Sequence, residues 1–125
     1  TPCGTLFPYT TLFRSRSFPE DETLANALSG GIGPDNEHTF GLVRNYVDEH
    51  VLVTENEIRN AMVFAAKEHK MVVEGGGAVG IAAVLAGKMG HAGNSIAVVV
   101  SGGNIDMRTF SSIVVDADWT TDHND

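Results

Sequence analysis

Apolar residues along this chain occur either at helical spacing or in short unbroken runs. Ile58, Met62 and Ala65 recur every three or four positions, which is typical of the buried face of a helix. Helical spacing or a run of small residues predicts five helices, over 23–28, 39–47, 54–69, 81–86 and 107–115. Unbroken apolar runs predict three buried strands, over 50–53, 71–73 and 95–100. Because strands and helices alternate after residue 50, the pattern predicts an α/β fold with a partial parallel sheet and packed helices.

Local signals predict where two of these helices begin and end. Thr54 and Glu57 have capping-box spacing, in which each side chain accepts a hydrogen bond from the other residue's backbone N–H. Residues 74–80 predict a glycine-rich turn before the small-residue helix over 81–86. Gly87 then suits the left-handed position that ends a helix.

The composition is that of an ordinary globular domain. Of the 125 residues, 42% are hydrophobic and 19% are charged, which allows one domain with a modest core. The net charge of −8 argues against nucleic acid or an anionic membrane as a partner. Cys3 is the single cysteine, so an intrachain disulfide is excluded and a cytoplasmic location fits.

The first residues are not typical of a protein. Residues 5–15 (TLFPYTTLFRS) agree at every position with the translation of a widely used sequencing-adapter oligonucleotide. The alternative is a β-hairpin with a proline turn. We expect residues 1–16 to be an artefact, residues 17–115 to be the genuine domain and residues 116–125 to be an acidic tail. We also expect the natural chain to begin upstream of Ser17.

The glycines at 75–80 leave more than one interpretation open. They match G-x-G-x-x-G after a predicted strand, which is the pattern of a dinucleotide-binding loop and favours an NAD oxidoreductase. Two observations count against that interpretation. A dinucleotide-binding loop needs an acidic residue about 20 positions on, but residues 99–101 in that region are not acidic and the next acid is Asp106. In addition, Glu74 would place a negative charge beside the phosphates. The other interpretation is tight packing of a helix on a strand. A non-catalytic α/β interaction module is a further alternative.

Candidate chemistry lies at the end of the last predicted strand. Ser101, Gly102, Gly103 and Asn104 follow the apolar run 95–100. A hydroxyl followed by two glycines lets a flat ligand approach the backbone and offers it a neutral hydrogen bond. Open α/β sheets bind ligands at this edge, where Glu74, at the end of a neighbouring predicted strand, would face the same ligand.

Five segments together carry a resemblance to a known family: 23–26 (TLAN), 47–49 (VDE), 51–58 (VLVTENEI), 72–78 (VVEGGGA) and 99–106 (VVSGGNID). In this order and spacing they resemble the C-terminal part of the large domain of a fold type II (tryptophan synthase β-like) pyridoxal-phosphate (PLP) enzyme. The group is that of the threonine/serine dehydratases and serine racemases. Residues 27–33 and 74–80 are most similar to the hydroxyectoine-utilisation dehydratase branch.

The resemblance implies PLP as cofactor and a role for six residues. Ser101 would hydrogen-bond the pyridine nitrogen, and Gly102, Gly103 and Asn104 would shape the loop that holds the ring. Glu74 would lie near the ring, and Gly30, with the backbone of 27–30, would approach its other edge. No catalytic residue is assigned, because the family's Schiff-base lysine belongs to an N-terminal motif that is not found here.

The same resemblance implies an activity and an assembly. A neutral serine at the ring nitrogen favours β-elimination of water from a small hydroxy amino acid such as threonine or serine, giving a 2-oxo acid and ammonia. The intact enzyme would be a homodimer, and this fragment alone would be inactive. No metal ligand is assigned, since the five histidines show no metal-ligand spacing.

Overall fold

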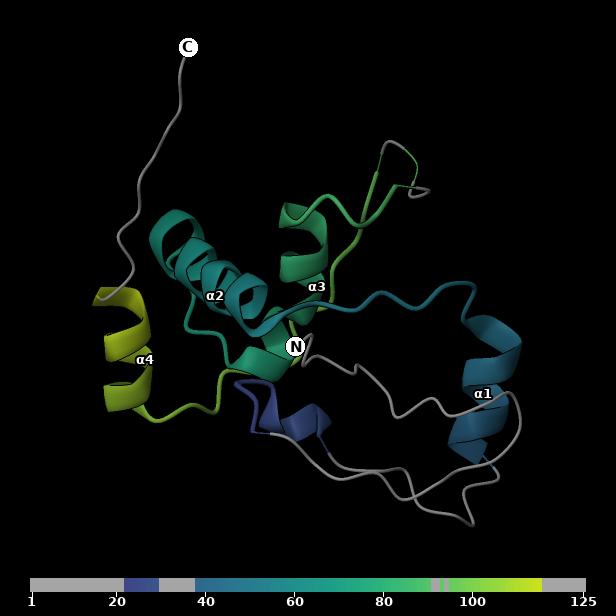
Figure 1. Cartoon of the computed structure of the whole chain (residues 1–125), viewed down its shortest axis with the longest axis horizontal. Coiled ribbons are helices and arrows are strands. Elements are labelled where there is room, and N and C mark those ends of the chain that lie inside the picture. Colours follow the sequence, from purple (N-terminus) through teal and green to yellow (C-terminus); the bar gives the residue numbers. More distant parts are fainter. Residues whose placement is uncertain (1–21, 30–37, 91–92, 94, 116–125) are drawn as a thin grey trace.

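The structure, a computed structural model, describes residues 22–29, 38–90, 93 and 95–115. These residues form a short 3₁₀-helix, η2 (Asn26–Leu28), and the helices α1 (His38–Tyr46), α2 (Glu55–His69), α3 (Gly75–Leu85) and α4 (Met107–Val115). α2 packs against α3 and α4, η2 packs against α3, and α1 lies apart from the others (Figure 1). The predicted helices over 39–47 and 107–115 are confirmed, whereas 23–28 forms only the single 3₁₀ turn.

The start of α2 follows the local signal in its sequence. The Glu57 N–H donates to Thr54 Oγ1 over 3.3 Å, and the Thr54 N–H donates to Glu57 Oε2 over 2.6 Å, so the capping box is confirmed. The helix ends at His69 as predicted, because Lys70 adopts the left-handed conformation with φ 56°. The predicted apolar face, Ile58, Met62 and Ala65, is buried.

The prediction of a turn over 74–80 is wrong, because α3 already begins at Gly75. Among the glycines that the structure describes, only Gly87 has a positive φ, 66°. The earlier glycines therefore supply space for neighbouring backbone rather than a turn conformation. Gly87 ends the helix as predicted: its N–H donates to the Val84 carbonyl, and the Lys88 N–H donates to the Ala83 carbonyl, both over 3.0 Å.

The three predicted strands are extended segments, and none forms a β-strand within the described ranges. Val53 and Val73 are buried as expected, with 2% and 0% exposure. The prediction that 95–100 is a buried strand is wrong, because Ile96, Val98 and Val99 are exposed, Val99 by 82%. The physical reason is that α3 contacts this segment from one side, through Gly80 and Val98, while no described strand pairs with it. The parallel sheet remains a prediction.

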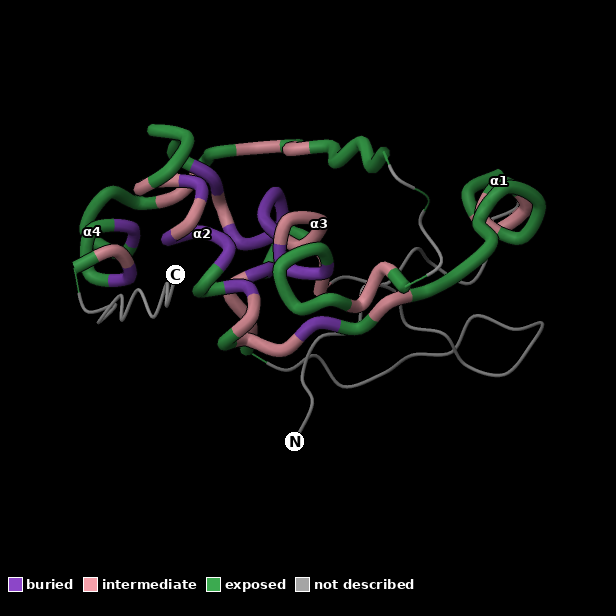
Figure 2. The backbone as a smooth tube through the Cα atoms, turned by 90° about the horizontal axis from the view of Figure 1, so that it is seen from above, coloured by how far each residue is buried: buried purple, intermediate pink, exposed green. Residues whose placement is uncertain are grey.

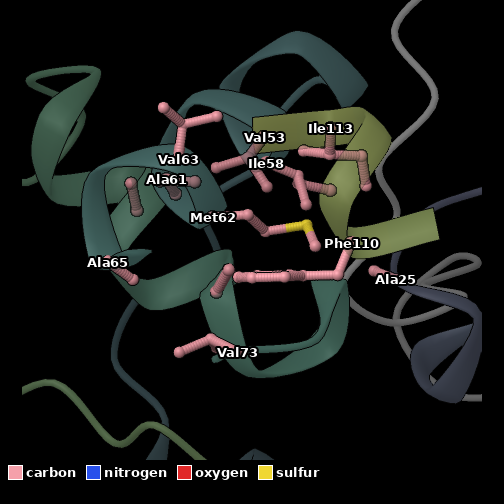
Figure 3. Packing of buried hydrophobic residues seen from close by; sticks show 13 residues of the cluster. Ala25, Val53, Ile58, Ala61, Met62, Val63, Ala65, Val73, Phe110 and Ile113 are labelled. Atoms are coloured by element: carbon pink, nitrogen blue, oxygen red, sulfur yellow. The ribbon is translucent and has the colours of Figure 1, made fainter. Parts of the chain in front are cut away.

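The hydrophobic core lies between α2, α3 and α4, as the buried stretches of the tube show (Figure 2). Met62 is fully buried and lies between Ile58 and the ring of Phe110 (Figure 3). The remaining core residues are mostly small or β-branched: Ala25, Val53, Ala61, Val63, Ala65, Val73, Ala78, Ala82, Ala83 and Ile113. Small residues on α3 let its backbone approach its neighbours closely, and this determines the geometry of the site.

Candidate functional site

The two segment ends that the sequence analysis singles out lie side by side. Glu74 follows the extended segment 71–73, and Ser101 follows the extended segment 95–100. The Glu74 N–H donates to the Gly102 carbonyl oxygen over 3.2 Å. Residues separated by more than twenty positions in the sequence are thereby joined at one place, as expected for two ends that face one ligand.

The two segments can lie this close because Gly102 and Gly103 have no side chains. A Cβ on Gly102 would lie 2.5 Å from Glu74 Oε1, and a Cβ on Gly103 would lie 2.5 Å from the Val72 carbonyl oxygen. Cβ atoms in proteins essentially never lie within 3.0 Å of such atoms, so a side chain at either position would force a neighbouring group to move. Gly103 is therefore required by the packing of the loop itself, whatever ligand it meets, whereas a side chain at Gly102 would meet only the Glu74 side chain, which can turn away.

The polar side chains at this place are available to a ligand. Ser101 and Asn104 are exposed, and Glu74 is half-buried. Glu74 is the N-cap residue of α3, but its side chain accepts no capping hydrogen bond. A hydroxyl, an amide and a carboxylate thus lie on one short stretch of surface, where they could bind a small polar molecule.

Asp106 closes the loop on the side of α4. Its Oδ1 accepts from the Thr109 N–H at 3.0 Å and from the Arg108 N–H at 3.1 Å, and the Phe110 N–H donates to its carbonyl oxygen. The hydrogen bond from the Thr109 backbone is the main reason why the pKa of Asp106 is lowered. Asp106 therefore caps α4 and is engaged in holding the loop.

Glu55 holds the residues that come shortly before the segment 27–30, which is expected at the cofactor's other edge. Its Oε2 accepts from the Leu24 N–H at 2.8 Å, and its Oε1 accepts from the Thr23 hydroxyl. A Cβ on Gly75 would lie 2.1 Å from the Leu24 carbonyl oxygen, and a Cβ on Gly76 would lie 3.5 Å from Ala27 Cβ, so residues 24–28 rest on the start of α3. Gly30 lies outside the described residues. The described part of the segment and the Ser101 loop thus both contact the first turn of α3.

This geometry favours packing over dinucleotide binding for the glycines of α3. Gly75, Gly76 and Gly77 are buried, and the space beside them holds the carbonyl groups of Leu24 and Gly102. Carbonyl oxygens repel phosphate, which needs exposed N–H donors at a helix N-terminus. The first turn of α3 is therefore a packing surface.

Lys88, the lysine nearest to the start of α2, forms a structural ion pair, and the described residues hold no cluster of metal ligands. Lys88 Nζ donates to Glu57 Oε2 at 2.7 Å and to the Leu52 carbonyl oxygen at 2.9 Å. The hydrogen bond from Lys88 is the main reason why the pKa of Glu57 is lowered. No three metal-ligating side chains gather among the described residues, and no helix there is long and apolar enough to cross a bilayer.

Sequence reasoning missed the residues that hold the loop from behind. Gly77 contacts Gly102 and Val72 contacts Gly103, while the contact of Leu24 with Gly75 lies at the start of α3 and not at the loop. The only signal was the density of glycines after Glu74, which were predicted to form a turn and were interpreted either as a dinucleotide-binding loop or as close packing of a helix on a strand. The contact partners could not be found from spacing, because they come from distant parts of the chain.

Comparison with known proteins extends this picture. A family model described as pyridoxal-phosphate dependent enzyme matches residues 8–102. An L-threonine ammonia-lyase of Thermotoga maritima is 45% identical over 92 residues, which cover 74% of this chain and 22% of that protein. An L-threonine ammonia-lyase of Geobacter sulfurreducens is 40% identical over 96 residues, 77% of this chain and 23% of that protein. A catabolic L-threonine dehydratase of Staphylococcus aureus is 36% identical over 98 residues, 76% of this chain and 28% of that protein.

The chain spans about a quarter of the length of these curated relatives, between 22% and 28%. The family match starts at residue 8 and so overlaps the segment 1–16 that we expect to be an artefact; the adapter origin stays a prediction. The match covers most of the chain and includes Glu74 and Ser101. On this evidence the chain belongs to the family of pyridoxal-phosphate dependent enzymes.

Proposed function

We propose that the whole protein catalyses PLP-dependent elimination of water from threonine or serine, after which water hydrolyses the released imine to a 2-oxo acid and ammonia. In this proposal the chain forms one part of the cofactor site. The observation that carries it is the hydrogen bond between Glu74 and Gly102, which brings a carboxylate and the Ser101 loop together at an exposed place. The names of the relatives, L-threonine ammonia-lyase and L-threonine dehydratase, support the reaction class.

The residues present fit a flat pyridine ring. The Ser101 hydroxyl is exposed and can donate to a ring nitrogen. Gly102 and Gly103 carry no side chain that would cover the ring beside it, and Asn104 is exposed next to them. Glu74, on the adjoining segment end, is placed to face the same ring. Gly30 would complete the site from the other edge.

When bound, PLP supplies an electron sink for negative charge at the substrate's Cα. Ser101 would keep its own proton on Oγ and donate it in a hydrogen bond to the unprotonated ring nitrogen. An aspartate there would instead hold a proton on the nitrogen and strengthen the sink. The neutral serine thus favours prompt loss of a β-hydroxyl, which is the step a dehydratase needs.

Ser101→Ala in the full-length protein tests this role. Loss of one neutral hydrogen bond should raise the PLP dissociation constant about tenfold and shift the absorption maximum of the bound cofactor. Ser111→Ala is the matched control, because Ser111 is an exposed serine on α4, and it should stay within about twofold. An unchanged affinity and spectrum in Ser101→Ala would refute the role, and a full-length protein that deaminates threonine without PLP would refute the function.

Several finer assignments are part of the same proposal. The similarity of 27–33 and 74–80 supports the hydroxyectoine-utilisation branch, and comparison of turnover on different hydroxy amino acids tests it. The extended segments 71–73 and 95–100 would join a parallel sheet in the whole domain. The net charge of −8 supports a small amino acid rather than nucleic acid as partner, and the lack of any cysteine after Cys3 supports the cytoplasm.

Assembly and boundaries are proposed on the same basis. Exposed apolar side chains such as Val99 and Val115 support packing against further protein, and we assign the whole enzyme as a homodimer, which sedimentation tests. Residues 17–115 would be the C-terminal part of the PLP-binding domain, followed by an acidic tail over 116–125. Sequencing of the transcript with the adapter removed tests whether residues 1–16 belong to the protein.

A further inference from the structure

The glycines of α3 that the dinucleotide interpretation used have contacts of a different kind. Gly77 and Gly80 are three positions apart and so share one face of the helix. A Cβ on Gly77 would lie 2.6 Å from the Gly102 carbonyl oxygen, and a Cβ on Gly80 would lie 2.7 Å from Val98 Cγ1. This face of α3 therefore lies directly against the segment that leads into Ser101 and the loop that follows it.

The other described contacts of the loop are the approach of Gly103 to the Val72 carbonyl oxygen and the capping of α4 by Asp106. The loop is joined to Glu74 by one backbone hydrogen bond, and the Ile105 N–H donates back to the Gly103 carbonyl within the loop. Ser101 and Asn104 are exposed, so their own side chains add little packing that would fix the loop. The position of Ser101 thus depends on how closely α3 approaches.

We propose that Gly77 and Gly80 are positioning residues whose missing side chains set the place of the Ser101 hydroxyl. This inference rests on the proposed role of Ser101 at the cofactor. An alanine at 77 must push the Gly102 backbone from 2.6 Å out to the 3.4 Å at which ordinary contact begins. Because Gly102 follows Ser101 directly, the hydroxyl moves with it, and the Glu74–Gly102 hydrogen bond lengthens.

The chain supplies a matched control in the same turn of the same helix. A Cβ on Gly76 would lie 3.5 Å from Ala27 Cβ and 3.6 Å from Leu28 Cγ, which is ordinary contact. Gly76→Ala makes the same chemical change on another face of α3. It should leave the Ser101 loop where it is.

The experiment measures two quantities in the full-length protein. In the cofactor-free form, Gly77→Ala should speed hydrogen exchange at the Glu74 N–H at least about tenfold, because a weakened hydrogen bond opens more often. In the reconstituted form, it should raise the PLP dissociation constant about tenfold, as loss of the Ser101 hydrogen bond would. Gly76→Ala should change neither quantity by more than about twofold.

If Gly77→Ala does not fold, Gly80→Ala and Val98→Ala test the same inference. Gly80→Ala meets a side chain rather than backbone, so Val98→Ala in the same protein removes the obstacle. Gly80→Ala should raise the PLP dissociation constant severalfold, and the double variant Gly80→Ala with Val98→Ala should restore it. Val98→Ala alone should stay near the parent value.

The outcomes separate this inference from the function it rests on. It is overturned if Gly77→Ala, or in its place Gly80→Ala, leaves affinity and exchange unchanged, or if Gly76→Ala disturbs both as much as Gly77→Ala. If Ser101→Ala weakens PLP binding and Gly77→Ala does not, the positioning role fails and the proposed function stands. If Ser101→Ala has no effect, the proposed role of Ser101 fails first, and a faster exchange in Gly77→Ala would show only a structural contact.

Discussion

Gly75→Ala and Gly76→Ala should have opposite effects on stability although the residues are neighbours in one helix. A Cβ on Gly75 would lie 2.1 Å from the Leu24 carbonyl oxygen and 2.8 Å from the Ala25 nitrogen. Both obstacles are backbone atoms, so no side-chain rotation relieves them. A Cβ on Gly76 meets only side-chain atoms at ordinary contact distance.

The magnitude follows from what holds Leu24 in place. Glu55 accepts hydrogen bonds from the Leu24 N–H and the Thr23 hydroxyl. A displacement of the segment breaks both, and hydrogen bonds to a charged group contribute about 1.5–3 kcal/mol each. Alanine in a helix regains about 0.5–1 kcal/mol over glycine. Gly75→Ala should therefore lose about 2–5 kcal/mol, whereas Gly76→Ala should gain about 0.5–1 kcal/mol.

Two measurements on the full-length protein check this prediction. The urea midpoint should fall for Gly75→Ala and rise slightly for Gly76→Ala, with the same slope. Hydrogen exchange at the Leu24 N–H should become faster only in Gly75→Ala, because that N–H loses its bond to Glu55. A Gly75→Ala protein that is as stable as the parent, or that keeps Leu24 protected, would contradict the packing argument.

Two further predictions concern the core and the pH dependence. Met62→Ala should lose about 2–5 kcal/mol because the side chain is fully buried, whereas Met107→Ala, 56% exposed, should change the urea midpoint little. The folded pKa of Glu57 lies below its usual value of 4.5, so its stabilisation is present above that value and is lost as the pH falls through the folded pKa. Glu57→Gln should therefore reduce the difference between urea midpoints at about pH 7 and about pH 3.5.

Where neighbouring residues decide the structure, the sequence was sufficient. Thr54 and Glu57 satisfy each other's backbone groups within one turn, so the start of α2 was predictable. Gly87 was predictable at the end of α3 because glycine is favoured in the left-handed conformation that often follows the last turn of a helix. The residues around Glu74 and Ser101 could be proposed from sequence because each group is contiguous in the chain, and their role at a cofactor stays a prediction.

Tertiary structure decided what depends on distant partners. Positions 75 and 77 must be glycine because Leu24 and Gly102 occupy the space that a Cβ would fill, and no local pattern identifies those partners. Val99 is 82% exposed although its segment has the composition of a buried strand, because burial depends on whether another segment covers it. Hydrogen bonds between neighbouring residues can therefore be predicted from the sequence, whereas close packing is determined only when separate parts of the chain meet.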